Sequence, residues 1–226
     1  MNNTVIAIDG PAGAGKSTVA KKIAEQLNFL YLDSGALFRA ITYKVMKTGI
    51  TMDDEKSIIE VANNAKIEFI DNIVFLDGQD VNNEIRSNTI NVNVSYVAKI
   101  PKVREIVVNI ERSIASNRNV VVDGRDIGTT VFPNAFIKFY MIASVEERAK
   151  RRLKELNAFS NKYTFEEIKN QINERDNIDS NRSVSPLKKA DDAIIIDTDG
   201  KGIEQVVAEM LYKISIKGEK NVIQNS

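Results

Sequence analysis

Short apolar runs alternate along this chain with longer segments in which apolar residues recur at helical spacing. The runs are nearly continuous, as is typical of strands that are buried on both faces of a parallel sheet. They lie at Val5–Ile8, Phe29–Leu32, Val120–Val122, Phe136–Ile142 and Ala193–Ile196. Because consecutive parallel strands need crossover connections, the pattern predicts an α/β fold with one five-stranded parallel sheet and helices on both of its faces.

The helical segments indicate where these connections run. Apolar stripes of helical period extend over residues 19–27, 103–114 and 203–214. Two segments with capping-box spacing, which begin at Ser144 and Thr164, predict helices that start just after these residues.

The segment from Lys66 to Val81 interrupts the alternation. It has the pattern of short strands, with hairpin turn signals at Asp71-Asn72 and Asp77-Gly78. An antiparallel hairpin cannot be threaded through a parallel core without interrupting it. We therefore expect a small insert with an antiparallel sheet at about residues 62–100.

Composition and charge narrow the function. The 226 residues carry 31 Lys+Arg and 31 Asp+Glu and include neither His nor Cys. The balanced charge argues against one large basic surface, and the missing His and Cys exclude serine-histidine and cysteine-histidine mechanisms and thiolate metal sites. The longest apolar run, Phe139–Ala143, is far shorter than the roughly 20 residues of a membrane span. We expect a cytoplasmic protein that binds neither nucleic acid nor membrane, and any metal to be a hard, oxygen-ligated cation such as Mg²⁺.

The clearest motif follows the first predicted strand and precedes a helical stripe. The sequence GPAGAGKS satisfies the pattern G-x-x-x-x-G-K-[ST] of a phosphate-binding P-loop. Backbone N–H groups of such a loop form an anion nest at a helix N-terminus, the Lys reaches the β- and γ-phosphates, and the Ser hydroxyl ligates Mg²⁺. The motif predicts ATP or GTP binding by Gly10, Pro11, Ala12, Gly13, Ala14, Gly15, Lys16, Ser17 and Thr18.

Other residues discriminate between classes of P-loop protein. A GTPase needs a guanine-reading Asn-Lys-x-Asp, but the chain's one Asn-Lys pair, Asn161-Lys162, is followed by Tyr163-Thr164. Many arginines lie next to turn residues, and phosphoryl transfer is catalysed largely by positioned cations, which favours a kinase. Two alternatives stay open: a P-loop kinase of another small molecule, and a non-catalytic nucleotide-binding regulator.

Several further motifs occur in a fixed order along the chain. They are Ile8-Asp9-Gly10-Pro11, Leu32-Asp33-Ser34-Gly35-Ala36, Glu84-Ile85-Arg86, Pro101-Lys102-Val103-Arg104-Glu105, Asp123-Gly124-Arg125-Asp126-Ile127-Gly128-Thr129, Glu174-Arg175-Asp176 and Asn181-Arg182. From Ile8 to about Ile203, the chain resembles the bacterial-type cytidylate kinases within the nucleoside monophosphate kinases. The resemblance implies transfer of the ATP γ-phosphoryl group to CMP or dCMP, giving ADP and CDP or dCDP.

The same resemblance implies a division of the chain. The antiparallel insert would be the monophosphate-binding part, and a short lid would close over ATP. We expect a monomer with a P-loop core at residues 1–61 and 101–217, the lid within it at about 148–164, the insert at 62–100 and a disordered tail at 218–226.

The resemblance also implies contacts to the acceptor phosphate. Ser34, Arg39, Arg125 and Arg182 would make them, since arginine offers a two-pronged fork to phosphate. Read without the resemblance, Ser34 and Arg39 fit a helix cap and a solvated arginine equally well. The family usually has Tyr where this chain has Phe38, which lacks the hydroxyl.

Base and sugar contacts are implied in the same way. Asp126 would accept from the cytosine amino group, where uracil carries an acceptor oxygen instead. Ser95 and Arg104 would make the remaining base contacts, and Arg175 and Asp179 would hold the sugar hydroxyls. By spacing alone, a turn ion pair or a solvated helix face accounts for these residues as well.

The remaining candidates concern charge at the reacting phosphate. Asp123 ends the third predicted strand, where a carboxylate can hold Mg²⁺ through water beside Ser17. Arg151 or Arg152, in a basic helix that resembles the lid, would reach the transferring group. Lys16, Arg125, Arg182 and one lid arginine would then spread positive charge over the transition state.

Overall fold

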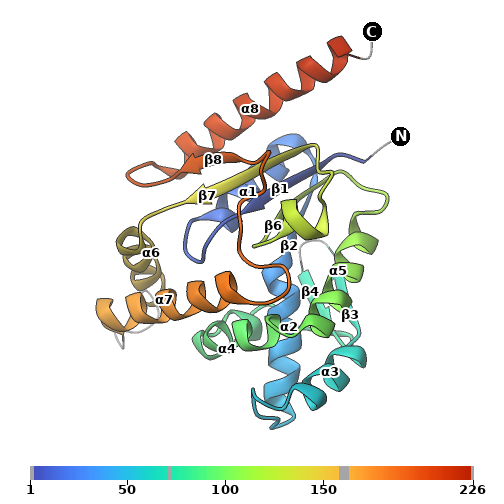
Figure 1. Ribbon diagram of the computed structural model, residues 1–226, viewed down its shortest axis with the longest axis vertical. Helices are drawn as coiled ribbons and strands as arrows, with labels where there is room; N and C mark the ends of the chain where they lie inside the picture. Colours follow the sequence, from blue (N-terminus) through green and yellow to red (C-terminus); the bar gives the residue numbers. More distant parts are fainter. Residues whose placement is uncertain (1–2, 71–72, 158–162, 225–226) are drawn as a thin grey trace.

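The computed structural model describes residues 3–70, 73–157 and 163–224 (Figure 1). A central sheet has the strand order β2-β6-β1-β7-β8, and every neighbouring pair is parallel. Its strands are β1 (Val5–Asp9), β2 (Leu30–Asp33), β6 (Val120–Asp123), β7 (Ile137–Ile142) and β8 (Ile194–Asp197). The predicted five-stranded parallel sheet is confirmed, with strand ends that differ from the prediction by one residue.

Helices cover both faces of this sheet, as Figure 1 shows. On one face, α1 (Lys16–Leu27) and α8 (Ile203–Gln224) pack on Ile6, Ile8 and Phe139. On the other, α2 (Ser34–Lys47) and α5 (Pro101–Ala115) pack on alternate residues of the same strands, including Ala7 and Leu32. Successive strand residues point to opposite faces, so near-continuous apolar runs are what two covered faces require.

The insert contains the expected antiparallel sheet. Its elements are α3 (Glu55–Asn63), β3 (Ile67–Ile70), β4 (Ile73–Leu76), β5 (Gln79–Asp80), η1 (Glu84–Arg86) and α4 (Asn88–Ala98). Asp77 and Gly78 both have positive φ, 51° and 80°, which is the conformation of the tight hairpin turn predicted there. The other predicted turn, at residues 71–72, lies outside the described residues. Phe69, Val74 and Ile85 belong to the same hydrophobic cluster as α2, so the insert shares the main core.

Two further helices form the rim beside the sheet. α6 (Val145–Asn157) and α7 (Phe165–Asn181) begin just after Ser144 and Thr164, as predicted, and Thr164 forms a full capping box with Glu167. They share a small apolar cluster whose buried members are Ala149, Ile168 and Ile172. Residues 158–162 of the expected lid lie outside the described residues.

The C-terminal segment differs from the expectation. α8 continues to Gln224, through residues expected to form a disordered tail from 218 onwards. Val206, Val207 and Met210 anchor the helix on the sheet, and an anchored helix can be extended by adding one hydrogen bond per residue. In the part of the chain that the structure describes, no helix is both long and apolar enough to cross a membrane.

Candidate active site

A cleft of about 1310 Å³ lies along the carboxyl edge of the sheet. The ends of β1, β2 and β6 meet there, where ligands bind in open α/β sheets. Gly10 and Pro11 shape the loop behind it, and every other predicted site residue lines it. These are residues 12–18 of the P-loop and Ser34, Arg39, Ser95, Arg104, Asp123, Arg125, Asp126, Arg151, Arg152, Arg175, Asp179 and Arg182.

The P-loop passes close to strand β7. Gly10 has φ +144°, and a Cβ at this position would lie 2.1 Å from the Met141 carbonyl oxygen, so only glycine fits. The loop ends at α1, whose N-cap, Gly15, makes no side-chain hydrogen bond to the first helical N–H groups. Lys16 is 5% exposed and donates from Nζ to the Pro11 carbonyl at 2.8 Å, and burial lowers its pKa. A helix N-terminus without a side-chain cap, next to a desolvated ammonium, suits a polyphosphate.

A buried carboxylate stands beside the loop. Ser17 Oγ donates to Asp123 Oδ2 at 2.9 Å, and Tyr31 Oη donates to Asp123 Oδ1 at 2.8 Å. Burial raises the pKa of Asp123 and of Tyr31. Within residues 3–70, 73–157 and 163–224, no group of three or more acidic side chains is placed to hold a metal. Hydroxyl and carboxylate oxygens fit Mg²⁺, which commonly takes one or two protein ligands and completes its shell with water and phosphate.

Asp126 lies at the floor of the cleft and is 2% exposed. Its Oδ2 accepts from Arg104 Nη2 at 2.5 Å, and its Oδ1 lies 3.4 Å from Arg182 Nη2. Arg104 also donates to the Ala98 carbonyl, and its guanidinium stacks over the Phe38 ring at 5.0 Å from the centroid. These contacts fix the Asp126 carboxylate in place at the lining of the cleft.

Asp179 forms a second charged group on α7. Its carboxylate accepts from Arg125 Nε at 2.9 Å and from Ser95 Oγ at 3.2 Å, and Arg182 lies at 3.8 Å. Burial alone would raise the pKa of Asp179, but Arg125, Arg175 and Arg182 outweigh it and lower the pKa. Burial lowers the pKa of Arg175 to about 10, so its guanidinium stays charged at neutral pH. α7 ends at Asn181, so Arg182 follows the helix in an extended conformation and still lies 3.8 Å from the Asp179 carboxylate.

The other predicted arginines differ in how firmly they are held. Arg39 donates to Asp33 Oδ2 at 2.7 Å. Arg151 donates to the Thr198 hydroxyl and carbonyl oxygens at 3.0 and 2.7 Å. Arg152 donates to Glu155 at 3.1 Å through Nη1, whereas its Nη2 is buried and has no partner among the described residues.

Three contacts near the cleft were missed by the sequence analysis. Asp9 accepts from the backbone N–H groups of Ile127 and Gly128 at 2.8 and 2.7 Å, and burial raises its pKa to about 6. Arg148 joins the P-loop to α7, since its Nη1 donates to the Ala12 carbonyl at 3.0 Å and to Asp176 at 2.6 Å. The sequence did offer one sign of the Asp9 contact, because Asp9 is a charged residue at the end of a buried strand, where its carboxylate needs a hydrogen-bond partner.

The third missed contact is the hydrogen bond from the Tyr31 hydroxyl to Asp123. It was missed because Tyr31 lies within an apolar run that predicted a strand and no role for the hydroxyl. A fourth residue of interest, Glu111, lies inside α5 and is fully buried. A buried carboxylate two helical turns from Arg104 gives no clear signal in sequence, because charged residues usually face solvent.

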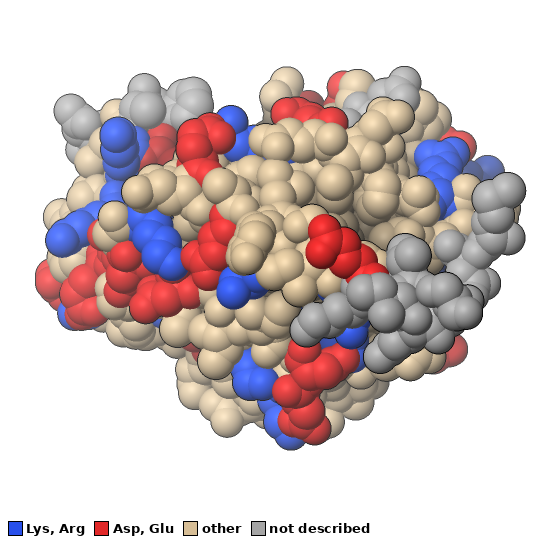
Figure 2. All heavy atoms as spheres, turned by 90° about the horizontal axis from the view of Figure 1, so that it is seen from above, with Lys and Arg blue, Asp and Glu red and all other residues tan. Residues whose placement is uncertain are grey.

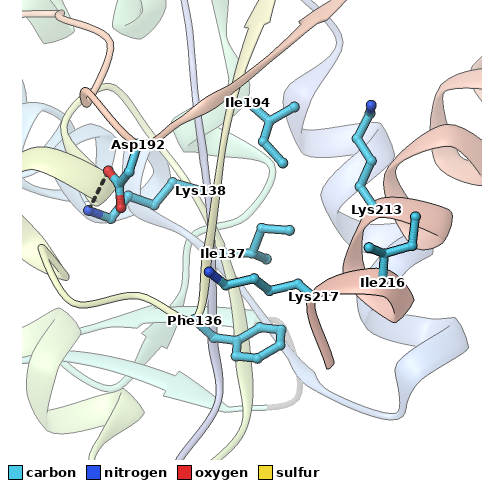
Figure 3. A pocket seen from close by; sticks show the side chains of 8 residues that line it. All are labelled: Phe136, Ile137, Lys138, Asp192, Ile194, Lys213, Ile216 and Lys217. Carbon is cyan, nitrogen blue, oxygen red and sulfur yellow. Dashed lines mark hydrogen bonds and ion pairs between the residues drawn. The ribbon is translucent and has the colours of Figure 1, made fainter. Parts of the chain in front are cut away.

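A second hollow of about 230 Å³ lies at the amino ends of β7 and β8 (Figure 3). Phe136, Ile137, Ile194 and Ile216 line it, beside a 2.9 Å ion pair between Lys138 and Asp192. None of the predicted site residues lines this hollow. The outer surface is mixed in charge, and Figure 2 shows Lys and Arg interspersed with Asp and Glu over one face. The cleft at the carboxyl edge is therefore the candidate active site.

Comparisons with known proteins agree with this geometry. A family model described as cytidylate kinase matches residues 6–216. A cytidylate kinase of Clostridioides difficile (strain 630) is 51% identical over 96% of this chain and 100% of the relative. One of Alkaliphilus oremlandii (strain OhILAs) is 54% identical over 93% of this chain and 97% of the relative. A gluconokinase crystal structure from Sinorhizobium meliloti 1021 shares the fold, with a TM-score of 0.55 and 14% identity, over 99% of this chain and 98% of the other.

Proposed function

Because the chain belongs to the cytidylate kinase family, we propose that the cleft at the carboxyl edge of the sheet is its nucleotide site. The enzyme transfers the γ-phosphoryl group of ATP to CMP or dCMP, giving ADP and CDP or dCDP. The observation that carries the assignment of the site is the buried Asp126 carboxylate, which two arginines hold at the floor of the cleft.

ATP would bind with its phosphates on the P-loop. The residues at the start of α1 line the cleft, and Lys16 supplies a desolvated ammonium there. The phosphates would stabilise the charged form of Lys16 and so raise its pKa again. Residues from Gly10 to Thr18 therefore make up the donor site in this proposal.

Ser17 and Asp123 would hold Mg²⁺, Ser17 through its hydroxyl oxygen and Asp123 through water. When bound, it neutralises charge on the β- and γ-phosphates. Tyr31 would orient the Asp123 carboxylate through its 2.8 Å hydrogen bond, as outer partners of metal ligands commonly do.

The acceptor phosphate would bind between Ser34, Arg39, Arg125 and Arg182. An oxygen of this phosphate attacks the γ-phosphorus, and the bond from that phosphorus to the β,γ-bridging oxygen breaks in line. The second pKa of a phosphate monoester is about 6, so the nucleophile is largely deprotonated at pH 7 and needs no strong base. A chain without His is consistent with this reaction.

Base selection would rest on Asp126. A carboxylate accepts from the cytosine amino group but repels the O4 of uracil. Arg104 and Ser95 would complete the base contacts, and Arg175 and Asp179 would bind the sugar hydroxyls. Ser95 belongs to α4 of the insert, and its hydrogen bond to Asp179 joins the insert to α7 on this side of the cleft.

The lid would close the donor side. Arg152 is the better candidate for the transferring phosphoryl group, because Arg151 is already held by Thr198 while Arg152 keeps a buried Nη2 that has no hydrogen-bond partner among the described residues. Closure excludes water and so favours transfer to CMP over hydrolysis of ATP. Residues 62–100 would act as the acceptor-binding part, since Ser95 and other residues of this segment line the cleft.

The test is ADP formation from Mg-ATP with CMP, dCMP, UMP, AMP or GMP offered separately, beside a reaction without acceptor. We expect strong turnover with CMP or dCMP and weak turnover with the others. Turnover with none of them would overturn the proposed function and leave only the P-loop assignment. Equal turnover with CMP and UMP would overturn the role of Asp126.

A further inference from the structure

The insert and α7 meet beside the cleft without a common apolar core. Helices α4 and α7 pack against each other there (Figure 1). Val94 and Val97 of α4 belong to the core cluster that contains α2. Ile168 and Ile172 of α7 belong to the separate small cluster shared with α6. Because no apolar cluster of the described residues includes both helices, side-chain hydrogen bonds matter for how α4 and α7 lie relative to each other.

Two side-chain hydrogen bonds join α4 to α7 in the described part of the chain. In the first, Ser95 Oγ donates to Asp179 Oδ1 at 3.2 Å. In the second, Tyr96 Oη donates to Glu174 Oε1 at 2.6 Å. Both residues of the first pair are proposed to contact CMP, so their hydrogen bond competes with the nucleotide. The second pair uses neither of these residues, and its hydrogen bond can persist whether or not CMP is bound.

Tyr96 and Glu174 lie directly beside residues that are proposed to bind the nucleoside. Tyr96 follows Ser95 on α4, and Glu174 precedes Arg175 on α7. Glu174 also lines the cleft. Lys99 Nζ lies 5.4 Å from the centroid of the Tyr96 ring, a cation–π contact that favours this position of the ring. The hydrogen bond therefore joins the two helices where one carries a base contact and the other a sugar contact.

We propose that Tyr96 and Glu174 are positioning residues, and that their hydrogen bond holds α4 against α7 so that the nucleoside contacts are preformed before CMP binds. Ser95 on α4 then faces Asp179 on α7 at a fixed separation. Without the Tyr96 hydroxyl, part of the binding free energy of CMP would be used to bring the two helices together, and the affinity would fall. The inference rests on the proposed roles of Ser95, Arg175 and Asp179, and it adds a contact that acts through them.

The kinetic test compares Tyr96→Phe, Glu174→Ala and the double variant with the wild type. Phe keeps the aromatic ring and lacks only the hydroxyl. Glu174→Gln is the conservative variant, because the amide oxygen of Gln still accepts a hydrogen bond. Tyr212→Phe is the matched control, because Tyr212 lies on α8, is 67% exposed and is not among the residues that line the cleft. The KM for CMP, the KM for ATP and kcat are measured for each.

We expect Tyr96→Phe to raise the KM for CMP about fivefold, which corresponds to the loss of one ordinary hydrogen bond. The KM for ATP is expected to stay at the wild-type value, because the proposed ATP site on the P-loop contains neither residue. Glu174→Ala is expected to show the same rise as Tyr96→Phe, and the double variant no further rise, because each change removes the same contact. Glu174→Gln is expected to lie closer to the wild type than Glu174→Ala, and Tyr212→Phe to match the wild type.

A distance measurement tests the same contact without turnover. The chain has no Cys, so spin labels can be attached specifically through Thr89→Cys on α4 and Asn173→Cys on α7. Both positions are exposed, and neither lines the cleft. Without nucleotide, adding Tyr96→Phe to this labelled chain is expected to broaden the distribution of distances between the labels. CMP is expected to narrow the distribution again.

Three results would overturn the proposal. The first is a wild-type KM for CMP in Tyr96→Phe, and the second is an additive rise in the double variant, which would mean that Tyr96 and Glu174 act separately. The third is a distance distribution that Tyr96→Phe leaves unchanged. Failure of the wild type to turn over CMP would instead count against the proposed function. The distance measurement without nucleotide would still test the hydrogen bond, so the two failures are distinguishable.

Discussion

Replacing Asp126 by Asn is the sharpest test of how this enzyme selects its base. Asn keeps the shape of the side chain but removes the charge and replaces one acceptor oxygen by an NH₂ donor. With CMP, the variant loses a hydrogen bond from the cytosine amino group to a charged acceptor. With UMP, it gains a donor for the uracil O4, which the carboxylate repels.

The magnitude follows from the contacts of Asp126. A hydrogen bond to a charged group contributes about 1.5–3 kcal/mol, so kcat/KM for CMP is expected to fall about 10- to 150-fold. Because kcat/KM for UMP is expected to rise, the ratio of the two falls by more than either change alone. The variant also weakens the buried contacts to Arg104 and Arg182, and breaking a buried ion pair costs about 3–5 kcal/mol of stability. Arg104 keeps the Ala98 carbonyl, which limits this cost.

The assay is kcat/KM for CMP and UMP, with thermal melting measured on the same preparations. Asp192→Asn is the matched control, because this carboxylate pairs with Lys138, is 66% exposed on its side chain and lies away from the cleft. A folded Asp126→Asn variant with the wild-type ratio of CMP to UMP would refute the base-reading role.

Three other perturbations test separate contacts. Tyr31→Phe removes the hydroxyl that orients Asp123, so the Mg²⁺ concentration for half-maximal activity is expected to rise about tenfold. A titration with MgCl₂ at fixed ATP measures this concentration. An unchanged value would contradict the orienting role of Tyr31. Arg148→Met removes the hydrogen bonds from Arg148 to Asp176 on α7 and to the Ala12 carbonyl of the P-loop. We expect a lower melting temperature and a loss of about 3 kcal/mol in the free energy of unfolding. The KM for both nucleotides is expected to rise. In the wild type, the unfolded chain releases the Glu111 proton near pH 4.5 while the native state keeps it to about pH 8, so stability falls with rising pH across this window. The stability of Glu111→Gln does not depend on this ionisation. Urea denaturation at both ends of the pH window is therefore expected to show the free energy of unfolding of Glu111→Gln rising relative to that of the wild type by a few kcal/mol, since one unit of pKa difference corresponds to about 1.4 kcal/mol.

The strands and the P-loop were predictable from sequence for a simple reason. Each strand is covered on both faces, so nearly every position in it is apolar and the run can be recognised in the sequence. A P-loop also has a fixed sequence pattern, and Gly10 shows one physical reason for it, because a side chain there would clash with the Met141 carbonyl oxygen. The acceptor-site residues came from the resemblance rather than from their spacing. The structure brings them together in one cleft, and their individual roles remain predictions.

The missed contacts share a different property. Asp9 meets Ile127 across 118 positions of sequence, and Tyr31 meets Asp123 across 92. Arg148 reaches Ala12 across 136 positions. Local pattern does not encode such pairs, because each residue taken alone fits a strand end, an apolar run or a solvated helix face.

The pairing of the cleft arginines bears on how nucleotides approach the enzyme. Arg39, Arg104 and Arg125 each lie against a carboxylate of the same chain. Fields from such close opposite charges largely cancel beyond a Debye length, which is about 8 Å at physiological ionic strength. An incoming nucleotide therefore meets little long-range pull from these arginines and recognises them only at contact, as directed hydrogen-bond forks. We expect the association rate of CMP to depend weakly on salt concentration. CMP would then be selected by short-range contacts within the cleft rather than by long-range electrostatic attraction.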